Sequence, residues 1–112
     1  MSISFEGKVA IVTGAGNGLG KTYALLLASR GAKVVVNDLG SAFDGTGAAT
    51  GRVADEVVAR IQAEGGKATA NYDSVENGQA IIDDVMATHG RLDIVINNAG
   101  ILTPEVWSEL TL

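Results

Sequence analysis

The stretch of sequence that decides the fold is residues 8–20, which read KVAIVTGAGNGLG. Lys8–Thr13 is an apolar, β-branched run that ends at a glycine, and this pattern predicts a buried strand. A short glycine-rich turn follows, and beyond it the apolar residues recur with helical spacing. We therefore predict a helix over Gly18–Arg30, which Gly31 ends.

The same alternation of strand and helix continues along the chain. Further strands are predicted over Lys33–Asp38, Lys67–Tyr72 and Leu92–Asn97, and further helices over Val53–Glu64 and Glu76–His89. Strand–helix units of this length need parallel strands joined by right-handed crossovers. The predicted fold class is therefore α/β, a Rossmann-type doubly wound parallel sheet of about four strands in the order 3-2-1-4.

Apolar spacing also predicts which face of each helix packs on the sheet. The predicted inward residues are Leu19, Tyr23, Leu26 and Leu27 in the first helix, Val53, Val57 and Ile61 in the second, and Ile82, Val85 and Met86 in the third. Charged groups off these faces are expected to be solvated, including His89 at a helix end and the adjacent acidic pair Asp83-Asp84.

Composition and charge exclude several classes of protein. Lys and Arg number 8 against 13 Asp and Glu, and the net charge of −5 argues against a nucleic-acid or anionic-membrane partner. The absence of cysteine excludes disulfides, thiolate metal sites and cysteine nucleophiles, and no spacing suits another metal site. No apolar run is long enough to span a bilayer, and the first residues lack the pattern of a secretion signal.

The turn after the first strand has the chemistry of a phosphate cradle. Its glycines let the backbone approach a ligand closely, and the new helix offers free N–H groups and the positive end of its dipole. Glycine repeats alone are a weak indication, but this one joins a predicted strand to a predicted helix and precedes an acidic residue, Asp38, at the end of the second strand. The spacing Gly14, Gly18, Gly20, preceded by Thr13, resembles the short-chain dehydrogenase/reductase family.

The resemblance implies a dinucleotide cofactor. Asp38 is expected to accept hydrogen bonds from the hydroxyls of the adenosine ribose, and its carboxylate would repel the additional phosphate of NADP. No basic residue follows it in Leu39-Gly40, and Asn17 in the loop is neutral, so the predicted cofactor is NAD. The loop residues expected to bind it are Gly14, Gly16, Asn17, Gly18, Leu19 and Gly20.

Two further segments resemble the family. The run Asn71-Tyr72-Asp73-Ser74-Val75 ends the third strand, where the family contacts adenine, and the resemblance assigns that role to Asp73, Ser74 and Val75. The run Asn97-Asn98-Ala99-Gly100 is similar to the family's N-N-A-G element, which lines the cofactor cleft, and Asn98, Ala99 and Gly100 are carried over. A chance turn of Asn and Gly explains one such segment, but not several in the family's order.

A narrower resemblance is carried by four segments and by the long loop after the first of them: Val34–Gly40, Gly65–Ala68, Ala70–Val75 and Asn97–Leu102. Over residues 5–102 the chain resembles the (3R)-hydroxyacyl-CoA dehydrogenase unit of peroxisomal multifunctional enzymes type 2. It implies fatty-acid β-oxidation and a peroxisomal location, with the cytoplasm as the alternative, because residues 110–112 are Leu-Thr-Leu rather than Ser-Lys-Leu. We therefore divide the chain into an NAD-binding Rossmann half-domain, residues 1–102, and a divergent tail, residues 103–112.

The family's catalytic pair is not found in this sequence. Short-chain dehydrogenases use Tyr-x-x-x-Lys with a Ser and an Asn, and the lysine lowers the pKa of the tyrosine. Here Leu27 stands four residues after Tyr23, and Glu76 four after Tyr72. No catalytic residue is therefore predicted, and the chain alone is expected to be inactive, with the second half of the fold supplying the catalytic groups.

Three functions remain open on the sequence. The first is the NAD-binding portion of an oxidoreductase, and the second is a non-catalytic nucleotide-binding sensor or regulatory module. The third is an interaction protein. A fourth strand without a neighbour exposes an edge, which predicts a homo-oligomer or pairing with a complementary fragment through Leu92–Asn97.

Overall fold

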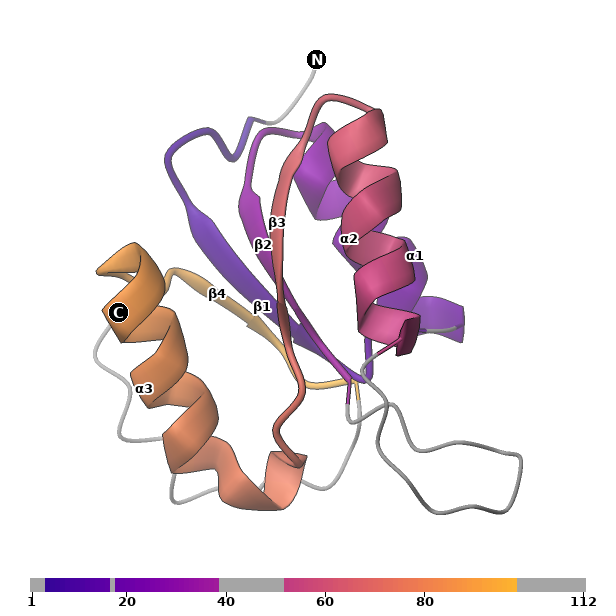
Figure 1. Ribbon diagram of the computed structural model, residues 1–112. Coiled ribbons are helices and arrows are strands. Elements are labelled where there is room, and N and C mark those ends of the chain that lie inside the picture. The colour runs from indigo at the N-terminus through magenta and orange to yellow at the C-terminus, as the bar shows by residue number, and fades with distance from the viewer. Residues whose placement is uncertain (1–3, 17, 39–51, 99–112) are drawn as a thin grey trace.

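The computed structural model describes residues 4–16, 18–38 and 52–98, and it confirms the predicted α/β fold (Figure 1). Four parallel strands lie in the order β3-β2-β1-β4. The elements are β1 (Val9–Thr13), α1 (Gly18–Ser29), β2 (Lys33–Asn37), α2 (Arg52–Ala63), β3 (Lys67–Asn71), the 3-10 turn η1 (Val75–Asn77), α3 (Gly78–His89) and β4 (Ile94–Ile96). The third helix thus begins later than predicted, because η1 precedes it, and β4 is shorter than predicted.

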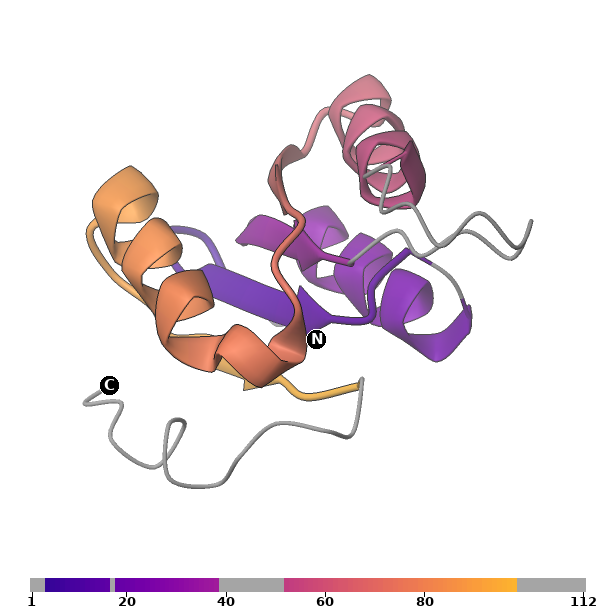
Figure 2. The same ribbon diagram turned by 60° about the horizontal axis from the view of Figure 1, so that its bottom comes forward.

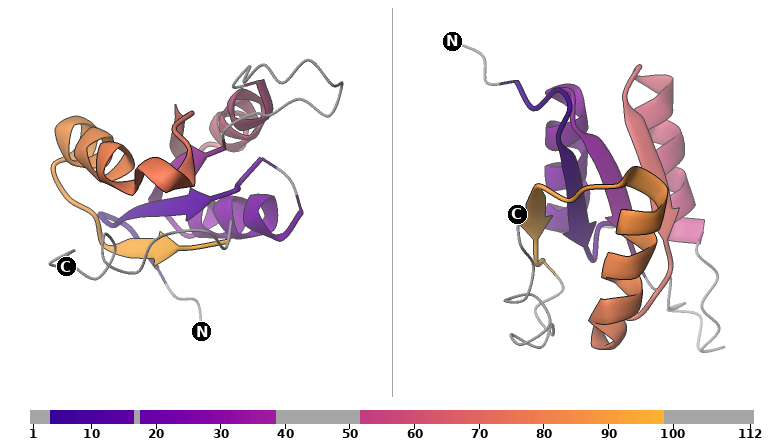
Figure 3. Two further views of the ribbon diagram at one scale, coloured as in Figure 1. Left: turned by 90° about the horizontal axis from the view of Figure 1, so that it is seen from below. Right: turned by 90° about the vertical axis from the view of Figure 1, so that its left-hand side faces the viewer.

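Helices cover both faces of the sheet, with α1 and α2 on one side and α3 on the other, as Figure 2 and Figure 3 show. Alternate residues of β1 enter different cores. Ala10 and Val12 pack in the cluster under α1 and α2, whereas Val9 and Ile11 pack in the cluster under α3. Burial on both faces explains why all five residues of β1 are buried and why the strand is apolar from Val9 to Val12.

The inward face of α1 differs from the prediction. Leu19, Tyr23 and Leu26 are 65%, 39% and 49% exposed, and Leu27 alone of the predicted set is buried. The buried residues of α1 are Gly20, Ala24, Leu27 and Ala28. The physical reason is close packing: small residues let the helix axis approach the sheet, and α1 carries apolar residues on several sides, so its periodicity was ambiguous.

The other two helices follow the prediction more closely. In α2, Val57 and Ile61 are buried as predicted and Val53 is half-buried. In α3, Ile82 and Val85 are buried, but Ile81 takes the inward position that was assigned to Met86, which is 45% exposed. Among the described residues, no helix has both the length and the apolar character that a bilayer crossing requires.

His89 is not the freely solvated group that was predicted. It ends α3, and its Nε2 lies 3.2 Å from Oγ1 of Thr69 in β3. Partial burial and, to a smaller extent, the nearby charge of Lys33 lower the pKa of His89, and Asp84 opposes them. The contact of the imidazole with Thr69 therefore helps to hold the last turn of α3 against β3, at the edge of the sheet.

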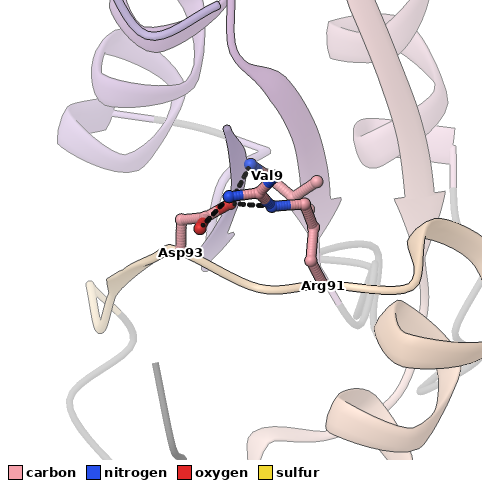
Figure 4. Close-up of polar contacts among 3 residues, drawn as sticks. All are labelled: Val9, Arg91 and Asp93. Atoms are coloured by element: carbon pink, nitrogen blue, oxygen red, sulfur yellow. Dashed lines mark hydrogen bonds and ion pairs between the residues drawn. The ribbon is translucent and has the colours of Figure 1, made fainter. Parts of the chain in front are cut away.

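The amino end of β4 is tied to β1 by a charged cluster (Figure 4). The backbone N–H of Asp93 donates to the carbonyl of Val9 at 2.8 Å, and the N–H of Val9 donates to Oδ2 of Asp93 at 2.8 Å. Arg91 donates from Nε and Nη2 to the two carboxylate oxygens of Asp93, each at 2.8 Å. These hydrogen bonds, with that from Arg91 first, lower the pKa of Asp93 from 3.8 to about 2.

This cluster predicts a pH-dependent contribution to stability. Because the pKa of Asp93 is depressed in the folded chain, its contribution is fully present above the ordinary value of 3.8 and is lost as pH falls through about 2. Asp93→Asn is expected to lower the melting temperature by about 3–6 °C at neutral pH. The difference from the parent should narrow as pH falls below about 4, which thermal unfolding followed by circular dichroism measures.

Glu64→Gln is the control for this change. It also removes one carboxylate, but the ion pair of Glu64 with Arg60 joins side chains that are 59% and 55% exposed, so little change is expected. Equal melting temperatures for parent and Asp93→Asn at neutral pH would show that the cluster does not stabilise β4.

Candidate functional site

The carboxyl ends of the strands meet at one edge of the sheet, at the bottom of Figure 1, and a row of polar residues marks this edge. Thr13, Asn37 and Asn71 are the last residues of β1, β2 and β3, and they pair in register. They are also the buried polar residues of the described chain, at 0%, 1% and 4% exposure. Crevices at this end of a parallel sheet are the usual ligand sites of such folds.

The glycine loop packs tightly against this edge. The N–H of Ala15 donates to the carbonyl of Asn37 at 2.9 Å, which fixes the loop to the end of β2. Gly14 and Gly18 have φ values of +63° and +59°, a region that favours glycine. A Cβ at Gly20 would lie 2.3 Å from the carbonyl oxygen of Gly14, so the first turn of α1 rests directly on the loop. An alanine at Gly20 would therefore overpack this contact, and overpacking of this kind lowers the free energy of unfolding by roughly 1–3 kcal/mol.

The N-terminus of α1 faces this loop with the properties of an anion site. Its first turn contains no acidic residue, so nothing there opposes the positive end of the helix dipole. The first N–H groups of a helix have no partners within the helix and are available to a phosphate. Leu19 projects from the same turn and is 65% exposed, which places an apolar group beside the loop.

Gly16 and Asp38 lie in direct contact. The N–H of Gly16 donates to Oδ2 of Asp38 at 2.9 Å, across the gap between the glycine loop and the end of β2. A Cβ at Gly16 would lie 2.1 Å from Cγ1 of Val53 and 2.7 Å from Oδ2 of Asp38. Glycine is therefore required here by the first turn of α2 and by the carboxylate, a packing reason that the sequence did not reveal.

Asp73 is held by a network of amides. Nδ2 of Asn37 donates to Oδ1 of Asn71 at 2.8 Å and to the carbonyl of Asp73 at 2.9 Å. The N–H of Asp73 donates to Oδ1 of Asn71 at 3.0 Å, and Nδ2 of Asn71 donates to Oδ2 of Asp73 at 3.1 Å. Ser74 follows and caps η1 by accepting from the N–H of Glu76 at 3.2 Å, and Val75 begins η1.

The sequence interpretation missed Asn37 and Asn71. Each follows a run of apolar or small residues in its strand, and a polar residue at such a position is buried unless the strand stops early. A buried amide must be hydrogen-bonded, so this pattern was the available signal. It also missed one contact of Asp84, whose Oδ2 accepts from Nδ2 of Asn71 at 2.9 Å while the residue is exposed, as was expected.

The end of β4 is joined to the glycine loop. Oγ1 of Thr13 lies 3.4 Å from the carbonyl of Ile96 and 3.4 Å from Oδ1 of Asn97. Nδ2 of Asn98 donates to the carbonyl of Gly14 at 3.2 Å. Of the predicted cofactor residues, Asn98 thus lies beside the loop, and Asn17, Ala99 and Gly100 are outside the described residues.

Tyr72 lies next to this site but does not have the properties of a catalytic tyrosine. Its hydroxyl donates to Oδ1 of Asp55 in the first turn of α2. That hydrogen bond, more than burial, raises the pKa of Tyr72 above its ordinary value. A tyrosine that exchanges a proton near neutral pH needs a lowered pKa. The contact joins the residue that follows β3 to the first turn of α2.

Two hollows lie at the opposite end of the strands. Their volumes are about 310 and 390 Å³, and both are lined by Ala28, Gly31, Gly65 and Gly66, where α1 and α2 have ended. None of the predicted cofactor residues lines either hollow, and parallel sheets bind ligands at the other end.

Known proteins with similar sequences are longer than this chain. A peroxisomal hydratase-dehydrogenase-epimerase of Neurospora crassa is 61% identical over 100 residues, which are 89% of this chain and 11% of that protein. Peroxisomal multifunctional enzyme type 2 of Mus musculus is 52% identical over 109 residues, which are 97% of this chain and 15% of that protein. The chain therefore spans a small part of the relatives that it matches.

The fold leads to the same group of proteins. The crystal structure of a short chain dehydrogenase from Mycobacterium avium superposes with a TM-score of 0.75 at 43% identity, over 92% of this chain and 37% of that one. The family model described as short chain dehydrogenase matches residues 8–112, nearly the whole sequence. The chain therefore belongs to the short-chain dehydrogenase family.

Proposed function

We propose that this chain forms the NAD-binding portion of a hydroxyacyl-CoA dehydrogenase of fatty-acid β-oxidation. The observation that carries the proposal is the contact between Asp38 and Gly16, which puts a carboxylate beside a glycine loop at the N-terminus of a helix. This is the arrangement that suits a ribose next to a pyrophosphate. The similarity to peroxisomal multifunctional enzymes supports the choice of substrate class and a peroxisomal location.

Different residues of the site would bind different parts of the cofactor. The loop and the first turn of α1 would bind the pyrophosphate through backbone N–H groups, and Asp38 would bind the ribose hydroxyls. Asp73, Ser74 and Val75 would border the adenine, and Asn98, Ala99 and Gly100 would line the continuation of the cleft. NAD, when bound, supplies the carbon that accepts a hydride from the substrate.

Charge favours NAD over NADP, although similar solved structures hold either NAD or NADP. The carboxylate of Asp38 is held in place by the N–H of Gly16, so it would not turn away from an additional phosphate on the ribose. Two negative groups this close repel each other, whereas a carboxylate and two hydroxyls form good hydrogen bonds. The proposed specificity therefore rests on one fixed acidic side chain.

The catalytic step is proposed to need residues outside this sequence. The 112 residues contain no Tyr-x-x-x-Lys pair, and the hydroxyl of Tyr72 is held by Asp55. This chain's residues would bind and orient the cofactor, and a serine, tyrosine and lysine from another segment or another chain would move the proton.

A second candidate function is suggested by β4. Within the described chain this strand pairs with β1 alone, and its three residues Ile94, Val95 and Ile96 are half-buried. An open, apolar strand edge favours pairing with another strand. We propose that a second copy of this chain or a complementary segment pairs there, which would also suit a non-catalytic nucleotide-binding or interaction module.

Binding of NAD by the purified chain is the first test of the proposed function. Calorimetric titration is expected to give binding of NAD and weaker binding of NADP. Asp38→Asn keeps an oxygen for the N–H of Gly16 but removes the charge, so it should bind NAD roughly tenfold more weakly and discriminate less against NADP. The exposed change Glu64→Gln is the control. A folded parent that binds neither dinucleotide would contradict the proposal and favour the interaction module.

Oxidation of a 3-hydroxyacyl-CoA by the chain, alone and mixed with the C-terminal half of a relative, tests the assignment of the catalytic step. No formation of NADH is expected from the chain alone, because it lacks the tyrosine–lysine pair. Absorbance at the NADH band should rise only after mixing. Turnover by the chain alone would show that the catalytic groups had been assigned wrongly.

Sedimentation velocity at micromolar concentrations tests the open edge of β4. We expect a dimer or larger species that dissociates on dilution, because edge pairing adds main-chain hydrogen bonds between chains. A folded monomer at every concentration would rule out pairing between copies of this chain.

A further inference from the structure

The amide of Asn71 is the centre of the polar network at the end of β3. Its Oδ1 accepts from Nδ2 of Asn37 at 2.8 Å and from the N–H of Asp73 at 3.0 Å. Its Nδ2 donates to Oδ2 of Asp73 at 3.1 Å and to Oδ2 of Asp84 at 2.9 Å. The two hydrogens of Nδ2 and the two lone pairs of Oδ1 are thus all used, as a buried amide requires.

This arrangement works in one orientation of the amide only. A rotation of the Asn71 amide by half a turn would aim its oxygen at two carboxylate oxygens and its NH₂ group at two N–H donors. Both replacements are repulsive, and the residue is 4% exposed, so water cannot easily compensate. The carboxylates therefore select the orientation in which Asn71 holds Asp73.

Asp84 supplies one of these carboxylates from outside the loop. It lies on α3, whose side chains Ile81 and Val85 are buried against the sheet, so its position is set by the packing of the helix. Its neighbour Asp83 is on the same turn, has the same charge and is exposed like Asp84, but it accepts from Nε2 of Gln79 at 2.9 Å. The two residues therefore differ in contact rather than in chemistry.

We propose that Asp84 is a positioning residue for the adenine side of the nucleotide site. Asp84 holds Asn71 by accepting its hydrogen bond, and Asn71 holds both the backbone and the carboxylate of Asp73. Through this relay, α3 fixes the loop that follows β3. The inference rests on the proposed function, in which Asp73 borders the adenine, but the relay itself is a property of the chain without ligand.

Three variants separate the hydrogen bond from the charge. Asp84→Ala removes the acceptor and the charge, Asp84→Asn keeps an acceptor oxygen without the charge, and Asp83→Ala removes the same charge from the same turn. The probes are AMP and NAD, titrated calorimetrically. Asp84→Ala is expected to bind both roughly three- to tenfold more weakly. Asp84→Asn and Asp83→Ala should stay within about twofold of the parent.

The second measurement does not depend on any ligand. Hydrogen exchange of the backbone N–H of Asp73, followed by NMR on the ¹⁵N-labelled chain, reports its bond to Oδ1 of Asn71. Exchange is expected to be faster in Asp84→Ala than in the parent, and unchanged in Asp84→Asn and Asp83→Ala. Melting temperatures of all four proteins show that the variants compared are folded.

The outcomes distinguish the positioning role from the proposed function. Equal affinities for parent and Asp84→Ala would overturn the positioning role, and so would equal losses in Asp84→Ala and Asp84→Asn, because charge alone would then be responsible. If the parent binds neither AMP nor NAD, the proposed function fails. In that case unchanged exchange at Asp73 in Asp84→Ala overturns the relay, and faster exchange supports it.

Discussion

In-register parallel pairing is the constraint on which the candidate site depends. Because β1, β2 and β3 are paired without a shift, their last residues Thr13, Asn37 and Asn71 form one buried row. Two of them then reach a segment at the end of a neighbouring strand. Asn37 reaches Asp73, and Thr13 reaches the end of β4. A slip of one residue in any pair would turn these polar groups to the opposite face.

The glycine loop adds a second constraint, which is one of distance. Gly20 allows α1 to rest on the carbonyl of Gly14, and Gly16 allows the loop to lie against both the first turn of α2 and Asp38. Both helices therefore begin at the edge where the polar row lies. The same requirement for close approach explains the small residues Ala24 and Ala28 on the inner side of α1, while Leu19 and Leu26 are left partly exposed.

The sequence predicted the parts of the structure that depend on local pattern. The strand order follows from the alternation of apolar runs and helical segments and from the glycine positions, whereas the contact of Gly16 with Asp38 was not predicted. Helix faces were predicted less well: Leu19, Tyr23 and Leu26 have the spacing of an inner face, yet close packing prefers Gly20 and Ala24. The Asn71 network was not predictable, because it joins residues far apart in sequence through side-chain orientation.

The two ends of β4 are held in different ways, and this sets the order in which the strand opens. At its amino end, charged groups of Arg91 and Asp93 and the backbone of Val9 are joined at 2.8 Å. At its carboxyl end, the neutral side chains of Thr13 and Asn98 make contacts of 3.4 and 3.2 Å. Hydrogen bonds with an ionised partner are the stronger kind. Fraying of this edge strand should therefore start at its carboxyl end, beside the glycine loop, and spread toward its amino end. The amino end stays paired longest, and the strand pairs again from there.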